Sequence, residues 1–331
     1  MRQELLKYLN CPICFKSNLE LSETAAAGQT IVEGRLVCED CKSDFLISKG
    51  IVYLYEKLSD TAEKEKKSNE REMREYHELL NFRDENWLLN FPDVSKMGLD
   101  ERTERINRLV SENTALSLKD IIKTNGNLIL EIGAGNCWAT ARMAENNYCV
   151  ALDILNLPPI GLEAGQVFIE NKNIYFERVL ADMLNLPFKD SVFDYVLISS
   201  SLHHSSDVKK TLSQINKLLK PGGKLILLNE PSRGLFGSEE RRQVDLDVNG
   251  GLNEGRYTIN QWKKLFNAGG FAAKIFLPRN LLKALRARGG AYKKISIIFE
   301  FPFFKQAVEF FLSGMILKIF DGYFNAILAK K

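Results

Sequence analysis

The stretch LILEIGAGNC, Leu128 to Cys137, decides the fold of this chain. An apolar run leads into an acid, Glu131, and two glycines then lie one residue apart, at 133 and 135. Such a run is typical of a strand that is buried in a parallel sheet and ends in a tight turn, where a helix begins. Glycines let the backbone approach a ligand closely, and the helix N-terminus offers N–H groups without intrahelical partners. The stretch therefore predicts a ligand site at this turn, for a dinucleotide or a nucleoside.

Strand-like and helix-like segments alternate around this stretch, from Asn127 to Pro231. Alternation of this kind predicts an α/β fold with a doubly wound, Rossmann-like sheet that binds ligands at the carboxyl ends of its strands. A dinucleotide fingerprint needs a third glycine, but Trp138 occupies that position. The sequence thus favours a different nucleoside ligand.

Acids recur at the ends of these predicted strands. Asp153 ends the next strand, 22 residues after Glu131, and Asp182 follows a further one. A carboxylate at the position of Asp153 can accept bonds from both ribose hydroxyls. Asp194 begins a strand instead, so we expect a structural role for it.

This set of motifs, with LLKPGGKLILLNEP at its end, resembles the class I S-adenosylmethionine-dependent methyltransferase family over residues 127 to 231. The resemblance implies that the glycine turn packs against the methionine part of S-adenosyl-L-methionine, that Asp153 holds the ribose, and that Asp182 and Met183 flank the adenine. The predicted cofactor residues are Glu131, Gly133, Ala134, Gly135, Asp153, Ile154, Asp182, Met183 and Ser199.

Four of the six cysteines form two Cys-x-x-Cys pairs, Cys11 with Cys14 and Cys38 with Cys41. Two such turns bring four thiolates into a tetrahedral shell, which leaves no open position and so predicts a structural zinc site. Two disulfides are the competing interpretation, which the lack of a secretory signal disfavours. Cys137 and Cys149 have no metal-ligand spacing and are expected to be small buried apolar residues.

Residues 5 to 55 resemble the small zinc-ribbon family that activates RNA and protein methyltransferases. Those activators are usually separate chains, so the sequence indicates a similar module fused to a methyltransferase. We expect a zinc-ribbon module at 1–57, a charged helical linker and cap at 58–126, and the cofactor-binding core at 127–278. The methyltransferase family closes its core with an antiparallel hairpin of two strands. This makes 322–331 the final core strand and 279–321 an insertion between the two strands.

The insertion is basic and amphipathic. From residue 274 to the end, eleven Lys and Arg stand against three Asp and Glu, whereas the whole chain carries a net charge of +3. Three interpretations stay open: a packed cap or homodimer surface, a peripheral element that reaches lipid-linked substrates at the inner face of a membrane, and an RNA-binding lid. Its apolar runs are broken by charges and Pro302, so no membrane-spanning helix is expected, and the protein is predicted to be cytoplasmic.

Methyl transfer from a sulfonium needs positioning, and it needs acid–base help only when the acceptor must lose a proton. His203 and His204 follow the strand that ends at Ser199, where an acceptor would approach, so either is a candidate base. Glu230 is a candidate substrate contact. A short segment, GGLNEGRYTINQWKKLFNAGGF, is similar to one in bacterial methyltransferases of surface-glycan biosynthesis.

The sequence therefore predicts a methyltransferase for a saccharide, lipid-linked or other small-molecule acceptor, methylated at oxygen. An RNA methyltransferase that docks through the zinc ribbon is the alternative, which is disfavoured because the chain outside its tail is net acidic. A scaffold that binds the cofactor without turnover is the alternative of another class.

Overall fold

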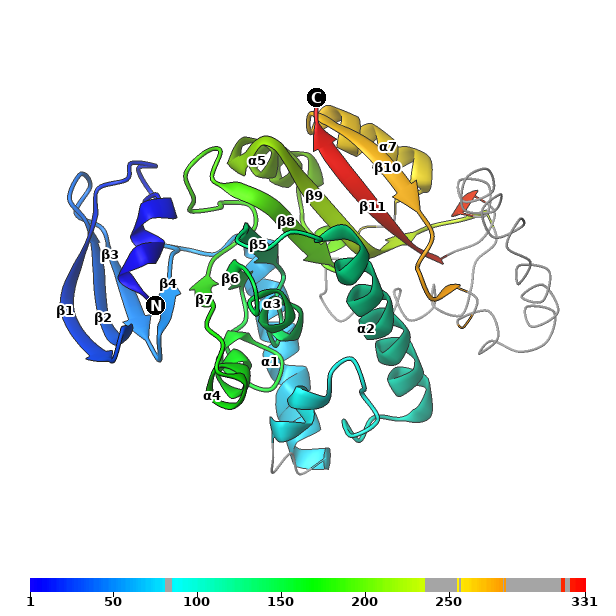
Figure 1. Ribbon diagram of the computed structural model, residues 1–331, viewed down its shortest axis with the longest axis horizontal. Helices are drawn as coiled ribbons and strands as arrows, with labels where there is room; N and C mark the ends of the chain where they lie inside the picture. Colours follow the sequence, from blue (N-terminus) through cyan, green and yellow to red (C-terminus); the bar gives the residue numbers. More distant parts are fainter. Residues whose placement is uncertain (81–84, 236–254, 256, 282, 284–316, 319–321) are drawn as a thin grey trace.

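The computed structural model describes residues 1–80, 85–235, 255, 257–281, 283, 317–318 and 322–331, with the side chains of 72–80, 85–86 and 102 left out. The described strands form one 11-stranded sheet, which crosses the molecule from β1 to the pair β11 and β10 (Figure 1). In spatial order they are β1 (Leu19–Ala27), β2 (Thr30–Cys38), β3 (Asp44–Ser48), β4 (Ile51–Tyr53), β7 (Glu177–Leu180), β6 (Tyr148–Asp153), β5 (Leu128–Ile132), β8 (Phe193–Ser199), β9 (Leu219–Ser232), β11 (Gly322–Lys330) and β10 (Phe271–Phe276).

The middle of the sheet is parallel, from β4 through β7, β6, β5 and β8 to β9. All five residues of β5 are buried, as the sequence predicted for a strand covered on both faces. Leu128, Leu130 and Ile132 belong to one apolar cluster, whereas Ile129 belongs to the other. Side chains alternate across a strand, so the two clusters lie on opposite faces of the sheet. The predicted doubly wound α/β sheet is confirmed.

Helices cover both faces. Leu212 of α5 and Trp262 of α7 pack in the first cluster, and Ala141 of α3 and Phe168 of α4 pack in the second. The helices are α1 (Asp60–Leu80), α2 (Glu101–Ile121), α3 (Trp138–Met143), α4 (Gln166–Lys172), α5 (Val208–Leu218) and α7 (Ile259–Ala268), and the short 3-10 helices are η1 (Gln3–Tyr8), η2 (Glu85–Asn90), η3 (Leu162–Gly165) and η4 (Leu202–His204). No helix among the described residues is long and apolar enough to cross a membrane.

The N-terminal region continues the sheet of the core. Strand β4 pairs in parallel with β7, and the N–H of Leu54 donates to the carbonyl of Leu180 at 2.9 Å. Strands β1 to β4 then extend the sheet in antiparallel order. The boundary at residue 57 stays a prediction, but hydrogen bonds of one sheet join the two sides of it.

The other edge of the sheet carries an antiparallel hairpin. Strand β11 pairs with both β9 and β10, where the sequence placed the final strand. Helix α7 precedes the hairpin, and Thr258 caps it with the reciprocal bonds of a capping box. Most of the insertion at 279–321 lies outside the described residues. The three interpretations given for it therefore stay predictions.

Candidate functional site

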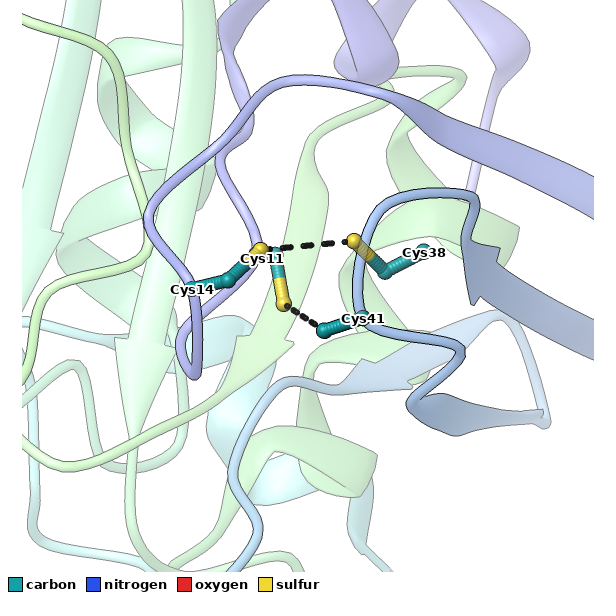
Figure 2. Close-up of side chains that lie close together, drawn as sticks. All are labelled: Cys11, Cys14, Cys38 and Cys41. Atoms are coloured by element: carbon teal, nitrogen blue, oxygen red, sulfur yellow. Dashed lines mark hydrogen bonds between the residues drawn. The ribbon is translucent and has the colours of Figure 1, made fainter.

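The four-cysteine cluster lies between η1 and β1 and between β2 and β3 (Figure 2). The Sγ atoms of Cys11 and Cys41 are 3.6 Å apart, and those of Cys14 and Cys38 are 3.5 Å apart. All four Sγ atoms lie within 4.8 Å of one another. A disulfide needs about 2.05 Å, and all four thiols are free. Tetrahedral zinc with bonds of about 2.3 Å holds its sulfurs about 3.8 Å apart, so the cluster fits a metal better than two disulfides.

Local groups shift the pKa values of these thiols in different directions. A hydrogen bond with the Ser43 hydroxyl lowers the pKa of Cys41 to about 6. The backbone N–H of Ile13 points at the Sγ of Cys11 at 3.4 Å. Burial nevertheless raises the pKa of Cys11 to about 12. A metal binds the deprotonated thiol, so the contacts of Cys41 are the ones that favour a bound cation.

Asp153 closes the glycine turn at the carboxyl end of β6. Its side chain is 8% exposed, and its two oxygens accept the N–H groups of Gly135 and Leu155, each at 2.8 Å. Burial raises the pKa of Asp153, although these backbone bonds oppose that effect. The carboxylate thus joins β6 to the turn that follows β5, as a ligand-binding acid of this edge would.

The turn itself requires glycine at position 133. Gly133 has a φ of +71°, and a Cβ there would lie 2.4 Å from the Oγ of Ser201, which follows β8. The N–H groups of Gly133 and Ala134 both donate to the carbonyl of Leu152. The close approach to the loop after β8 is therefore built into the backbone.

Glu131 lies beneath the turn. It is 3% exposed, and its carboxyl accepts a short hydrogen bond from the Thr140 hydroxyl of α3. Burial raises the pKa of Glu131 to about 8. The structure thus gives Glu131 a contact with the helix that follows the turn, and its predicted contact with the cofactor stays a prediction. Thr140 was missed because a threonine in a helix gives no signal in one sequence.

Asp182 follows the next strand, β7, at the same carboxyl edge. Its oxygens accept the N–H of Ser59 at 2.9 Å and the N–H of Leu184 at 2.8 Å. Beside it is a cavity of about 400 Å³, with Tyr55 and Leu58 on one side and Asn185 on the other. The structure therefore brings Glu131, Asp153 and Asp182 to the ends of three adjacent strands, as predicted. Five residues after β4 line this cavity and were not predicted to do so: Leu54, Tyr55, Lys57, Leu58 and Ser59.

His203 and Glu230 form a buried pair. The Nδ1 of His203 is 2.9 Å from the Oε2 of Glu230, and Glu230 has no exposed surface. The carboxylate also accepts the backbone N–H groups of Ser201 and Leu202 at 3.0 Å. Because a carboxylate accepts, Nδ1 carries the proton and Nε2 is the basic nitrogen. Glu230 contacts the η4 turn in this structure, and its contact with substrate stays a prediction.

His204 lies next to this pair, and its ring centroid is 4.2 Å from that of His203. Its Nδ1 is 3.4 Å from the Oε1 of Glu65, which belongs to α1. Since Ser59 also reaches Asp182, the start of α1 runs along the carboxyl edge of the sheet. Helix α1 thus covers the candidate site.

Ser199 ends β8, is half-buried and hydrogen-bonds with a buried polar cluster. Its Oγ is 3.2 Å from the Thr114 hydroxyl and accepts the amide of Asn229 at 3.1 Å. Asn113 links Asn229 to Asn325 with bonds of 2.7 and 2.9 Å. The sequence could not reveal this cluster, because its members come from α2, β9 and β11.

Known proteins support the domain assignment. Residues 130–227 match the family model described as a methyltransferase domain. Over 104 residues the chain is 36% identical to a demethylmenaquinone methyltransferase of Corynebacterium urealyticum, which covers 31% of this chain and 41% of that protein. Over 135 residues it is 36% identical to the 27-O-demethylrifamycin SV methyltransferase of Amycolatopsis mediterranei, which covers 37% of this chain and 47% of that protein.

A solved structure of Haemonchus contortus phosphoethanolamine N-methyltransferase 2 with S-adenosyl-L-methionine aligns with 78% of this chain and 60% of its own. The identity is 19% and the TM-score is 0.47. The two sequence matches described above span less than half of the length of each curated relative. The chain contains a methyltransferase domain, because the family model matches residues 130–227, which run from β5 to β9.

Proposed function

We propose that this protein is an S-adenosyl-L-methionine-dependent methyltransferase. The observation that carries the proposal is the glycine turn at 133–135, held by Asp153 and lying within the matched methyltransferase domain. The curated relatives named above are methyltransferases as well. The predicted cofactor residues fit the group, because a glycine cradle and two carboxylates converge at one edge.

When bound, the cofactor supplies an electrophilic methyl group for an in-line displacement. Gly133 and Gly135 let the backbone approach the methionine part. Asp153 would accept bonds from the ribose hydroxyls, and Asp182 with Met183 would hold the adenine, as the family resemblance implies.

On the acceptor side, the buried pair of His203 and Glu230 can hold a proton. Glu230 fixes the ring of His203 with Nδ1 protonated, so that Nε2 accepts the proton of an acceptor hydroxyl. This arrangement favours methylation at oxygen, where loss of a proton makes the acceptor a better nucleophile.

We infer an acceptor that is a saccharide, a lipid-linked molecule or another small molecule. The names of the two curated relatives refer to demethylmenaquinone and 27-O-demethylrifamycin SV, neither of which is a nucleic acid. The net acidic charge of the chain outside its tail also disfavours a phosphate backbone as substrate.

We propose in addition that the four-cysteine cluster holds a structural zinc ion. Its sulfur separations fit a tetrahedral site, and four cysteine ligands leave no position for substrate or water.

The test uses S-adenosylmethionine labelled on its methyl group, incubated with the protein and a fractionated cell extract. Label in a polysaccharide, lipid-linked or small-molecule fraction supports the proposal. Label in RNA would support the alternative acceptor, and cofactor binding by calorimetry without label in any fraction would support the scaffold.

A further inference from the structure

The cysteine cluster and the candidate cofactor site share one loop, residues 182–189 between β7 and β8. The backbone of Asn10, next to the ligand Cys11, donates to the carbonyl of Pro187 at 3.0 Å. The amide of Asn185 donates to the carbonyl of Pro12, on the other side of Cys11, at 2.8 Å. The first metal-binding turn is thus bonded to this loop on both sides of one of its cysteines.

The same loop begins with Asp182. The backbone N–H of Asn185 donates to the carbonyl of Asp182 at 2.9 Å and closes a tight turn between them. The side chain of Asp182 in turn accepts the N–H of Ser59, which the chain reaches directly after β4. Two routes therefore connect the N-terminal region to Asp182, one through Asn185 and one through Ser59.

We propose that metal occupancy of the four-cysteine cluster sets the position of Asp182 and thereby the affinity of the protein for the adenosyl part of its cofactor. Asn185 is the positioning residue that carries the coupling. This inference rests on the proposed cofactor site. The physical reason is that metal binding orders the turn at residues 11–14, whose neighbours Asn10 and Pro12 hold the loop; without the metal, these bonds lose a fixed partner.

A coupling of this kind is reciprocal. If the metal increases the affinity for the cofactor by some factor, the cofactor increases the affinity for the metal by the same factor. A cluster that merely stabilises the first 57 residues would show no such exchange. The reciprocity therefore separates a positioning role from a purely structural one.

The first experiment measures the affinity for S-adenosylhomocysteine by calorimetry in the zinc-loaded full-length protein and in N185A. Loss of one neutral hydrogen bond is worth roughly a threefold to tenfold change in an equilibrium constant. We expect N185A to bind the ligand about threefold to tenfold more weakly with its zinc content unchanged. N171A is the matched control, because Asn171 also donates its amide to a backbone carbonyl at 2.8 Å, on α4; we expect it to bind like the wild type.

The second experiment measures zinc affinity with a competing chelator, with and without saturating S-adenosylhomocysteine. We expect the ligand to tighten zinc binding in the wild type and N171A, and to do so less in N185A. A wild type that binds the ligand but keeps the same zinc affinity would overturn the coupling and leave the proposed function intact. A wild type that binds no ligand at all would instead overturn the proposed function.

Discussion

The N-terminal strands and the central strands belong to one sheet, yet they differ in how far they are buried. Of the nine residues of β1 only Leu19 is buried, whereas every residue of β5 is buried. Leu36 and Phe45 of the N-terminal strands belong to the same apolar cluster as Leu128 of the central sheet, and four cysteines converge in the N-terminal region. The central strands have apolar clusters on both faces.

This difference indicates where a bound metal would add most to stability. Apolar burial stabilises the centre by roughly 25 cal/mol per Å² and needs no ion. Strands β1 to β3 have fewer buried residues, so a metal ion at the four cysteines would add free energy where apolar burial adds least. The candidate catalytic groups lie at the carboxyl edge of the central strands, and the loop at residues 182–189 connects that edge to the cysteine cluster.

The largest effect is expected from a substitution in the four-cysteine cluster. C38S should release zinc and destabilise the N-terminal strands, because structural zinc sites contribute on the order of 10 kcal/mol of binding free energy. Metal analysis and thermal unfolding test this. C149A is the control, since Cys149 is buried in the central sheet; its zinc content should equal that of the wild type. Wild-type protein purified without any bound zinc would contradict the assignment.

The next effect falls on the glycine turn. G133A should lower the free energy of unfolding by about 1–2 kcal/mol for the left-handed backbone and by about 1–3 kcal/mol more for the overlap with Ser201. G126A is the matched control, because Gly126 has a φ of +76° and open space around its Cβ position. Equal losses in the two variants, measured by denaturant unfolding, would show that the turn does not need its close approach.

The effect on ligand binding is smaller. D153A should weaken cofactor binding by more than about tenfold, because it removes a buried charged acceptor from the site. Calorimetry measures this, with D190A as the control for loss of an exposed carboxylate. An unchanged affinity in D153A would remove Asp153 from the site.

The last prediction concerns how stability changes with pH, an effect that is small at any one pH step. Burial raises the pKa of Glu131 from 4.5 to about 8, so the folded state keeps a proton that the unfolded chain has lost. Its contribution to stability is complete below pH 4.5 and is lost as the pH rises to about 8, by at most about 1.4 kcal/mol per pH unit. E131Q should therefore flatten the decline of stability over this window relative to the wild type. E145Q changes an exposed residue and should show the same decline of stability with pH as the wild type. If E131Q loses stability with pH as steeply as the wild type, Glu131 is not the source of the decline.

Particular residues show how far sequence reasoning reached. The strand at Leu128 and the structural role of Asp194 were predicted, and the structure confirms both. Asp194 accepts the N–H of Leu128 and pairs with Lys220 at 2.8 Å. Cys137 and Cys149 are buried as predicted. These features depend on local pattern, spacing or hydropathy, which a single sequence records.

Other features depend on residues that are distant in the sequence. The pairing of β4 with β7, the bond between Asn185 and Pro12, and the asparagine cluster around Asn113 each join segments more than 100 residues apart. A hydrogen bond of this kind leaves no periodic signal, because either partner alone is an ordinary polar residue.

By itself the sequence determined the class of the sheet, the grouping of four cysteines and the acids at the strand ends, because these follow from hydropathy, side-chain chemistry and spacing along the chain. Only the tertiary structure decided that the first 57 residues extend the core sheet, that Glu230 lies buried against His203 rather than exposed, and that the start of α1 runs along the site. The physical reason is that packing and long-range hydrogen bonds select among arrangements that local propensities leave equal in energy.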